Sequence, residues 1–353
     1  MLGKLRHKIG HKIGRTVSRL KGQGPSDAVI LMYHRIAEVD TDPWSLCVTP
    51  QHFAEHLAVL RDYGTPLRLQ DLNQQLGEGQ RLRRSIVLTF DDGYADNFHQ
   101  AKPLLEQYDI PATVFITTGG IDQTQEFWWD ELDRLLLQPG RLPDVLRLTI
   151  DGEPCEWGLG EAAHYRQADF LRHHLWRMEA EDEAAADPTP RHGLYRSLYQ
   201  KLQHLSLAER GQLLDDIRVW ANAEPVGRPT HRSLSQEELV ELGSGELVEI
   251  GAHTVSHPFL ADLSIVSQQD EIQQSKDYLE RTLGRPVTSF SYPNGSYAAD
   301  TKAAVQAMGF DCACCSIADR VQPDSDRFLL PRVVVEDWDG ETFTEWLSGL
   351  LAL

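Results

Sequence analysis

Two adjacent carboxylates follow an apolar run in a segment that reads I-V-L-T-F-D-D-G-Y from residue 86. The first five side chains are β-branched, apolar or aromatic, a composition that predicts a buried strand. Asp91 and Asp92 come next, and Gly93 then allows the backbone to turn sharply. Two carboxylates at the end of a buried strand cost free energy unless they have partners. A metal ion is one such partner, because one acid can bind it while the other handles protons.

Two histidines follow a second apolar run, in a segment that reads H-T-V-S-H-P from His253. His253 and His257 are four residues apart, and on one helical turn or a tight loop this spacing brings both imidazoles to one side. One carboxylate and two imidazoles form a ligand set with open positions for water and substrate. Asp-Asp-Gly alone is more often a solvated turn, and His-x-x-x-His alone is a weak signal. Their joint occurrence at strand ends indicates a site.

Strands and helices must alternate to bring these segments together. Thr49-Pro50 predicts a helix start, as does the capping box that begins at Ser235. Roughly seven predicted strands alternate with helices, which predicts an α/β fold with a parallel, barrel-like sheet. Active sites of such barrels lie at the C-terminal ends of the strands. The candidate residues found at those ends are His34, Asp91, Asp92, His253, His257 and Asn294.

The alternation is interrupted between residues 119 and 232, where strand signals are few. We predict a mostly helical insertion there, between a first barrel part at 28–118 and a second at 233–353. Residues 1–27 form a basic N-terminal segment. Trp128 and Trp129, near the start of the insertion, suit stacking on sugar rings, but we favour core packing of the insertion as their role.

The net charge of −19 argues against nucleic acid as a main partner. Residues 1–21 nevertheless carry seven Lys or Arg and no acid, with apolar residues at three- and four-residue steps. This pattern predicts peripheral contact with an anionic membrane surface, and a disordered or packed arm is the alternative. We find no uninterrupted apolar stretch typical of a secretory signal. We therefore expect a cytoplasmic protein, peripheral on the inner membrane face, whose five cysteines form no disulfide framework.

The segments T-F-D-D-G-Y and H-T-V-S-H-P resemble the first two motifs of the polysaccharide deacetylases, carbohydrate esterase family 4. The resemblance covers residues 28–118 and 246–336. It implies a distorted (β/α)7 barrel and hydrolytic removal of an N-acetyl group from a sugar. It also implies a divalent metal ion, most readily Zn²⁺, held by Asp92, His253 and His257. Asp91 would be the general base.

The chain departs from the family at two motifs. The third motif, R-P-P-Y-G or R-P-P-F-G, is replaced by F-S-Y-P-N-G at residues 290–295, so Ser291 stands where the arginine is expected. This resembles a branch with a tyrosine-proline variant. The last motif, L-x-H, which supplies the general acid, is absent, and residues 329–333 read L-L-P-R-V. His34 is the candidate replacement for the acid. Arg332 is the candidate replacement for the arginine. Tyr94, Tyr292, Asn294 and Arg332 are the predicted substrate and oxyanion contacts.

The sequence thus predicts N-deacetylation of a polysaccharide, an oligosaccharide or a lipid-linked saccharide. One alternative is a metal-dependent C–N hydrolase, such as an amidase or imidase, since a fold does not define a substrate. The other is a non-catalytic carbohydrate-binding barrel. The missing L-x-H favours the second alternative, and the intact Asp-Asp and His-x-x-x-His segments disfavour it.

Overall fold

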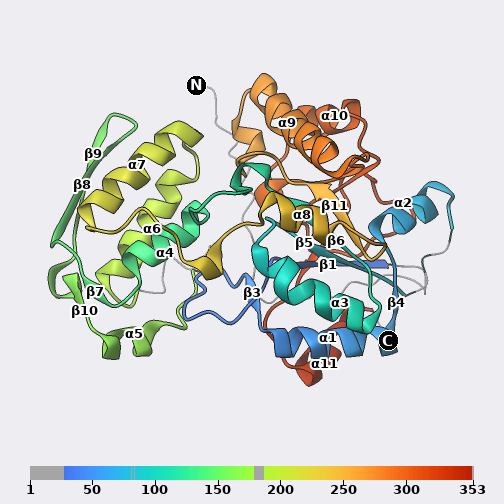
Figure 1. Cartoon of the computed structure of the whole chain (residues 1–353), viewed down its shortest axis with the longest axis horizontal. Helices are drawn as coiled ribbons and strands as arrows, with labels where there is room; N and C mark the ends of the chain where they lie inside the picture. The colour runs from blue at the N-terminus through green and yellow to red at the C-terminus, as the bar shows by residue number, and fades with distance from the viewer. Residues whose placement is uncertain (1–27, 81, 83, 179–186, 352–353) are drawn as a thin grey trace, which may run out of the picture.

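The apolar segments form the strands of a parallel sheet at the centre of the barrel part of the molecule (Figure 1). The structure is a computed structural model that describes residues 28–80, 82, 84–178 and 187–351. The segment predicted to contact membranes, residues 1–21, lies outside this range. Seven strands form one path, in the order β13-β12-β11-β6-β5-β1-β14. In chain order these strands are β1 (Ala28–Tyr33), β5 (Ser85–Phe90), β6 (Ala112–Ile116), β11 (Val248–Ala252), β12 (Ser289–Ser291), β13 (Cys312–Cys314) and β14 (Val333–Val334).

The continuous apolar runs of β1 and β5 are explained by burial on both faces of the sheet. The two strands pair in parallel over six residues, from Ala28 opposite Ser85 to Tyr33 opposite Phe90. Successive side chains alternate between two apolar clusters. Ile86 and Leu88 belong to the larger cluster beneath the surrounding helices, and Val87 belongs to a smaller one. Because neither face meets water, no polar alternation is required.

Hydrogen bonds link the two ends of the strand path. Ala313 of β13 donates to the Arg327 carbonyl and accepts from Leu330, and Cys315 donates to the Leu330 carbonyl. The segment 327–330 leads directly into β14, which pairs with β1. The sheet is therefore curled into a half-barrel, and the predicted distorted (β/α)7 barrel is confirmed.

Helices cover the outside of the sheet, and two of them begin where the sequence predicted. Thr49 caps α1 (Pro50–Tyr63) by accepting from His52 N. Ser235 and Glu238 form the predicted capping box of α8 (Gln236–Leu242). The other helices of this part are α2 (Leu69–Gly77), α3 (Lys102–Tyr108), α9 (Ile265–Leu283), α10 (Ala299–Ala307) and α11 (Gly340–Leu350).

The region 119–232 forms a second group of elements with its own apolar core, on the left in Figure 1. Its helices are α4 (Trp128–Leu136), α5 (Gln167–His173), α6 (Pro190–Leu202) and α7 (Leu207–Trp220). It also contains an unpredicted hairpin of β8 (Val145–Ile150) and β9 (Glu153–Gly158). The turn is Asp151-Gly152, and both residues have positive φ. This dipeptide between β-rich segments is a hairpin signal that the sequence analysis overlooked. The limits 119 and 232 stay a prediction.

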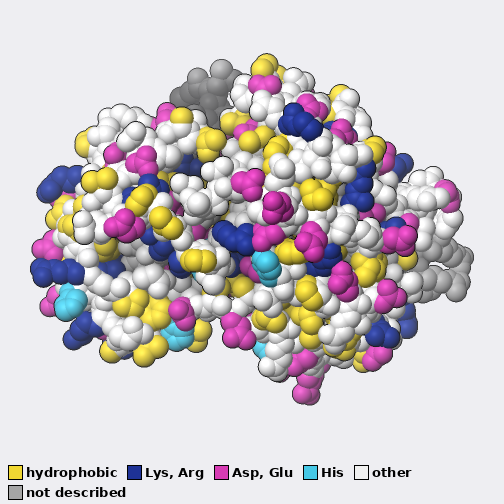
Figure 2. Space-filling model, viewed as in Figure 1, with side chains coloured by type: hydrophobic (Ala, Val, Ile, Leu, Met, Phe, Trp, Pro, Cys, Tyr) yellow, Lys and Arg dark blue, Asp and Glu magenta, His cyan; other side chains and the backbone are white. Residues whose placement is uncertain are grey.

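The described residues also contain shorter strands. These are the paired strands β2 (Arg35–Ile36) and β3 (Cys47–Val48), the paired strands β7 (Gly140–Arg141) and β10 (His164–Tyr165), and β4 (Thr65–Pro66), which pairs with the start of β5. Among the described residues, no helix combines the length and the hydropathy that crossing a bilayer requires. Acidic and basic side chains are mixed on the face shown in Figure 2, over both the insertion and the barrel.

Candidate functional site

The Asp-Asp pair lies at the C-terminal end of the central strand β5, where the backbone turns. Asp92 and Gly93 both have positive φ, 75° and 83°. This conformation is uncommon for an aspartate and is the kind of strain found at functional sites. Asp91 N donates to the Tyr33 carbonyl of β1, and the Asp92 carbonyl accepts from Thr117 N after β6. Neighbouring strands therefore hold the turn on both sides, and both carboxyl groups are buried.

The two histidines reach the same place from the end of β11. His257 Nε2 lies 3.3 Å from Asp92 Oδ1, and His253 Nε2 lies 3.6 Å from the same oxygen. One ligand atom from each of the three side chains lies within 4.8 Å of the others. Asp92 Oδ1 is buried without a hydrogen-bond partner among the described residues. A buried carboxylate oxygen that faces two imidazole nitrogens is the arrangement that a metal ion satisfies.

Groups around the histidines fix their orientation. His253 Nδ1 lies 2.8 Å from the Ser291 carbonyl. A carbonyl can only accept, so Nδ1 carries the proton and Nε2 keeps a lone pair toward the carboxylates. Glu271 of α9 accepts from the backbone N–H groups of Val255 and Ser256, both at 2.9 Å. It thereby holds the loop 253–257, which we call the ligand loop.

Asp91 is paired with Arg332, from the loop before β14. Arg332 Nη1 donates to Asp91 Oδ1 and Nη2 to Asp91 Oδ2, both at 2.7 Å. The Ser291 hydroxyl accepts from Arg332 Nη2 at 2.7 Å and donates to Asp91 Oδ2 at 3.2 Å. The bidentate pair is almost fully buried. The geometry is thus the one expected if Arg332 replaces the arginine missing at position 291, and its catalytic effect stays a prediction.

The two aspartates have opposite pKa shifts. Burial raises the pKa of Asp91, but Arg332 and then His253 outweigh burial and hold the pKa below its ordinary value. Burial raises the pKa of Asp92 well above its ordinary value, and the charge of Asp91 raises it further. Burial lowers the pKa of both His253 and His257. Asp91 is therefore kept ionised, and both imidazoles are kept neutral, as metal ligands must be.

The remaining predicted residues lie around this centre. His34, just after β1, is half-buried and lies close enough for its charge to lower the pKa of Asp91. The hydroxyl of Tyr94 donates to Asp130, and that of Tyr292 donates to the Phe328 carbonyl. Asn294 is half-buried with φ of 55° at the turn after β12. The predicted substrate contacts of Tyr94, Tyr292 and Asn294 stay predictions.

Sequence reasoning missed the part that the insertion plays at this centre. The Trp129 ring lies 5.0 Å from the His257 ring, centroid to centroid, and Trp129 Nε1 donates to the Tyr94 hydroxyl at 2.8 Å. Trp128 and Trp129 both belong to the apolar core of the insertion, as the core-packing alternative expected. A tryptophan that packs in one core and touches a candidate ligand leaves no spacing signal in the sequence.

Comparison with known proteins finds a family that this chain resembles in two segments. Residues 78–141 and 219–313 match the sequence model of the family described as polysaccharide deacetylase. A 103-residue stretch is 33% identical to YxkH of Bacillus subtilis (strain 168), which bears the name of a polysaccharide deacetylase. That stretch spans 29% of this chain and 36% of YxkH, so the chain matches about a third of this curated relative.

Solved structures share the fold over most of the chain. The deacetylase PplD of Streptococcus pyogenes, solved in complex with acetate, has a TM-score of 0.56 at 17% identity, covering 93% of this chain and 99% of PplD. IcaB of Ammonifex degensii has a TM-score of 0.57 at 16% identity, covering 92% and 97%. At such identities the likeness concerns the fold alone. The sequence match carries the assignment, because both the Asp91-Asp92 and the His253–His257 segments lie within it. The chain thus matches the polysaccharide deacetylase family over two segments that contain both motifs.

Proposed function

We propose that this protein hydrolyses the N-acetyl group of an acetylated sugar within a polysaccharide, an oligosaccharide or a lipid-linked saccharide. The observation that supports the proposal most strongly is the position of Asp91. It is held ionised by Arg332 directly beside a set of potential metal ligands, Asp92, His253 and His257. The family match supports deacetylation, and the ligand set supports a divalent metal ion, with Zn²⁺ the first choice for one carboxylate and two imidazoles.

The reaction breaks the amide C–N bond, adds the oxygen of water to the acetyl carbon, and releases acetate and a free amine. A divalent ion at the three ligands would polarise the acetyl carbonyl and acidify water there. Asp91 accepts the proton of the attacking water. Its pairing with Arg332 makes it a weak base, which suits a water of lowered pKa. His34 is our candidate to donate a proton to the leaving amine, since the L-x-H motif is absent.

The first test is the metal content of the purified protein beside that of Asp92→Ala. We expect about one divalent ion per chain in the wild type, from the single three-ligand group among the described residues, and a loss of the ion in the variant. Protein prepared without chelator that holds no ion, and takes up none on reconstitution, would contradict the proposal. Acetate release from N-acetylated oligosaccharides then separates deacetylation from amidase or imidase activity on small cyclic or linear amides.

We also propose a cytoplasmic setting with peripheral membrane contact through residues 1–21. The membrane contact is inferred from their seven basic residues alone. Vesicles containing phosphatidylserine should bind the full chain more tightly than a chain without these residues. Equal binding of the full and the shortened chain to these vesicles would contradict the proposed membrane contact.

A further inference from the structure

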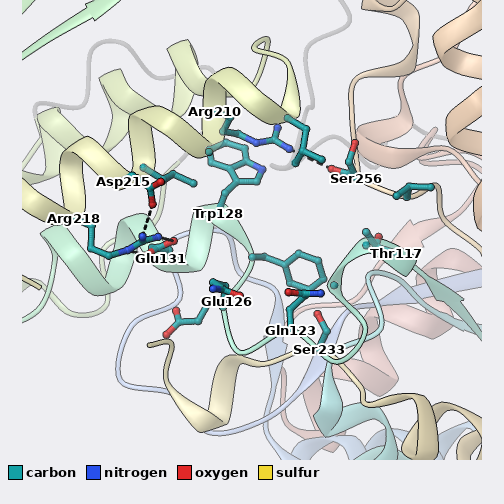
Figure 3. Close-up of a pocket in the computed structure, with 18 residues that line it drawn as sticks. Thr117, Gln123, Glu126, Trp128, Glu131, Arg210, Asp215, Arg218, Ser233 and Ser256 are labelled. Carbon is teal, nitrogen blue, oxygen red and sulfur yellow. Dashed lines mark hydrogen bonds and ion pairs between the residues drawn. The ribbon is translucent and has the colours of Figure 1, made fainter. Parts of the chain in front are cut away.

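A cavity of about 360 Å³ lies between the insertion and the barrel, next to the ligand loop (Figure 3). Its walls include Trp128 of α4, Arg210 of α7, and Val255 and Ser256 of the ligand loop. Asp92, His253 and His257 are not among its lining residues, although Ser256 directly precedes His257. A cavity of this size suits one sugar ring or a small charged group. A substrate held at the candidate metal centre therefore has a neighbouring space that the deacetylation chemistry itself does not use.

Arg210 places a positive charge at the edge of this cavity. Its side chain lies between Trp128 and Ser256 in Figure 3, and the residue is only 4% exposed. Nη2 donates to the Ser256 carbonyl at 3.3 Å, and the guanidinium lies 5.2 Å from the centroid of the Trp128 ring. Neither partner is an anion. Arg210 thus carries a buried charge, and burial lowers its pKa, with Glu271 the first of the groups that oppose this shift.

The other charged groups that line the cavity have ion-pair partners. Glu131 pairs with Arg134 and Arg218, and Asp215 also pairs with Arg218. Glu126 pairs with Arg228 at 2.8 Å. Arg210 lines the cavity beside these pairs. Within the described part of the chain, however, no carboxylate lies within 4.0 Å of its guanidinium. Buried arginines are normally paired, because the cost of desolvating the charge is otherwise uncompensated.

Two donors of Arg210 are directed at no protein group. Nε and Nη1 make no hydrogen bond within the described residues. Neither belongs to the fully buried atoms that lack a partner, so both remain accessible. Nη2 uses one of its two hydrogens on Ser256, so its other hydrogen, together with that of Nε or Nη1, leaves one two-donor edge. Such an edge beside a cavity can bind a carboxylate or phosphate through two parallel hydrogen bonds. The single long bond to Ser256 would connect α7 to the ligand loop, but it does not compensate the charge.

We propose that Arg210 forms a subsite for an anionic group of the saccharide substrate, on a sugar next to the one that is deacetylated. The group is a carboxylate, as in a uronic acid, or a phosphate, as in a sugar phosphate, since both fit a guanidinium edge. This inference rests on the proposed deacetylation. It narrows the substrate class to acidic N-acetylated saccharides.

Three probes separate the sources of the anion in calorimetric titrations of the metal-loaded protein. A hyaluronan tetrasaccharide offers carboxylates, chitobiose 1-phosphate offers a phosphate on the sugar next to its non-reducing N-acetylglucosamine, and chitotetraose is the neutral reference. Arg210→Met removes the charge but keeps apolar bulk on Trp128, and Arg210→Lys keeps the charge without the planar edge. Arg147→Met is the matched control, because Arg147 is an exposed arginine of the hairpin strand β8.

We expect Arg210→Met to weaken binding of one anionic probe about 10- to 100-fold relative to chitotetraose. Arg210→Lys should lose less affinity for that probe. Arg147→Met should leave the ratio of its affinity to that for chitotetraose as in the wild type. A loss confined to hyaluronan identifies a carboxylate, and a loss confined to the sugar phosphate identifies a phosphate. The subsite is refuted if Arg210→Met leaves both ratios unchanged, or if no anionic probe binds the wild type more tightly than chitotetraose.

Acetate release, followed in parallel, distinguishes this inference from the proposed function. Binding that depends on Arg210 without acetate release would retain the subsite and refute deacetylation. Acetate release with binding ratios that do not change in Arg210→Met would support deacetylation and refute the subsite.

Discussion

Asp91 and Asp92 adjoin in the sequence, but their carboxyl groups face different partners. Asp91 receives both Nη groups of Arg332 and the hydroxyl of Ser291, whereas Asp92 Oδ1 faces two imidazole nitrogens. The positive φ of Asp92 separates the two side chains at the end of β5. One residue is thereby suited to hold a proton-accepting charge and the other to bind a cation. This division of roles depends on Arg332, which lies 241 residues away from Asp91 in the chain.

Arg332→Met should strongly destabilise the protein, because it leaves the Asp91 carboxylate buried without its ion-pair partner. Breaking one side of a buried pair costs about 3–5 kcal/mol. The measurement is the free energy of unfolding in urea, with chelator present so that no metal compensates the charge. The double variant Arg332→Met/Asp91→Asn removes the stranded charge and should recover at least half of the loss. A double variant as unstable as the single one would show that Arg332 acts through packing instead.

His34→Gln tests the general-acid assignment. We expect kcat for acetate release to fall about 100-fold or more, the usual contribution of a positioned acid, with the metal content unchanged. His34 is not a predicted ligand, and the effect should therefore appear in turnover and not in metal binding. His164→Gln, at an exposed histidine of the insertion, is the matched control. Turnover equal to that of the wild type would remove His34 from the mechanism.

At the scale of elements, α9 holds the ligand loop through one side chain. Glu271 accepts two backbone N–H groups of the loop and, at 2.6 Å, the Ser256 hydroxyl. The loop contains two residues with positive φ, Thr254 and His257, which are costly unless the surroundings impose them. The helix therefore does more than cover the sheet, because it presents His257 at its position.

Glu271→Ala should weaken zinc binding about 10- to 100-fold, the usual effect of removing a group that orients a ligand. Competition with a chromogenic chelator measures the dissociation constant. Glu280→Ala is the control, because Glu280 also lies on α9 and accepts from a backbone N–H, that of Val287, outside the ligand loop. Both variants lose some stability. Equal zinc affinities in the two would show that Glu271 does not position the site.

The elements also show what a sequence can predict. The strand ends at Asp91 and His253 could be located because apolar runs and glycines mark them locally. The Asp151-Gly152 hairpin is also marked locally, by a dipeptide that favours a two-residue turn. The contacts of Glu271 and Trp129 with the ligand loop have no such mark. They depend on how α9 and α4 pack against the barrel. This packing depends on the fit of many side chains across two surfaces, which the spacing of residues along the chain does not reveal.

At the scale of the whole molecule, two apolar cores each contain a neutral, buried histidine. His56 is fully buried beneath α11, where Nε2 donates to the Trp338 carbonyl at 2.7 Å. His192 is 2% exposed and lies beside the core of the insertion. Burial lowers the pKa of each to about 4. Unfolding returns both to water, where a histidine has a pKa of about 6.5. Below that pH the unfolded chain binds more protons than the folded one.

Each histidine should therefore reduce the free energy of unfolding by about 1.4 kcal/mol per pH unit as the pH falls from about 6.5 to about 4. His192→Gln removes one of these contributions without adding a charge. Its unfolding free energy should consequently fall less steeply than that of the wild type across this range, even if it is lower at pH 7.5. Urea unfolding at pH 7.5, 6.0 and 5.0 measures the slopes, with His164→Gln as the exposed control. Parallel curves for wild type and His192→Gln would mean that His192 has the same pKa in the folded and unfolded protein and contributes nothing to the acid lability.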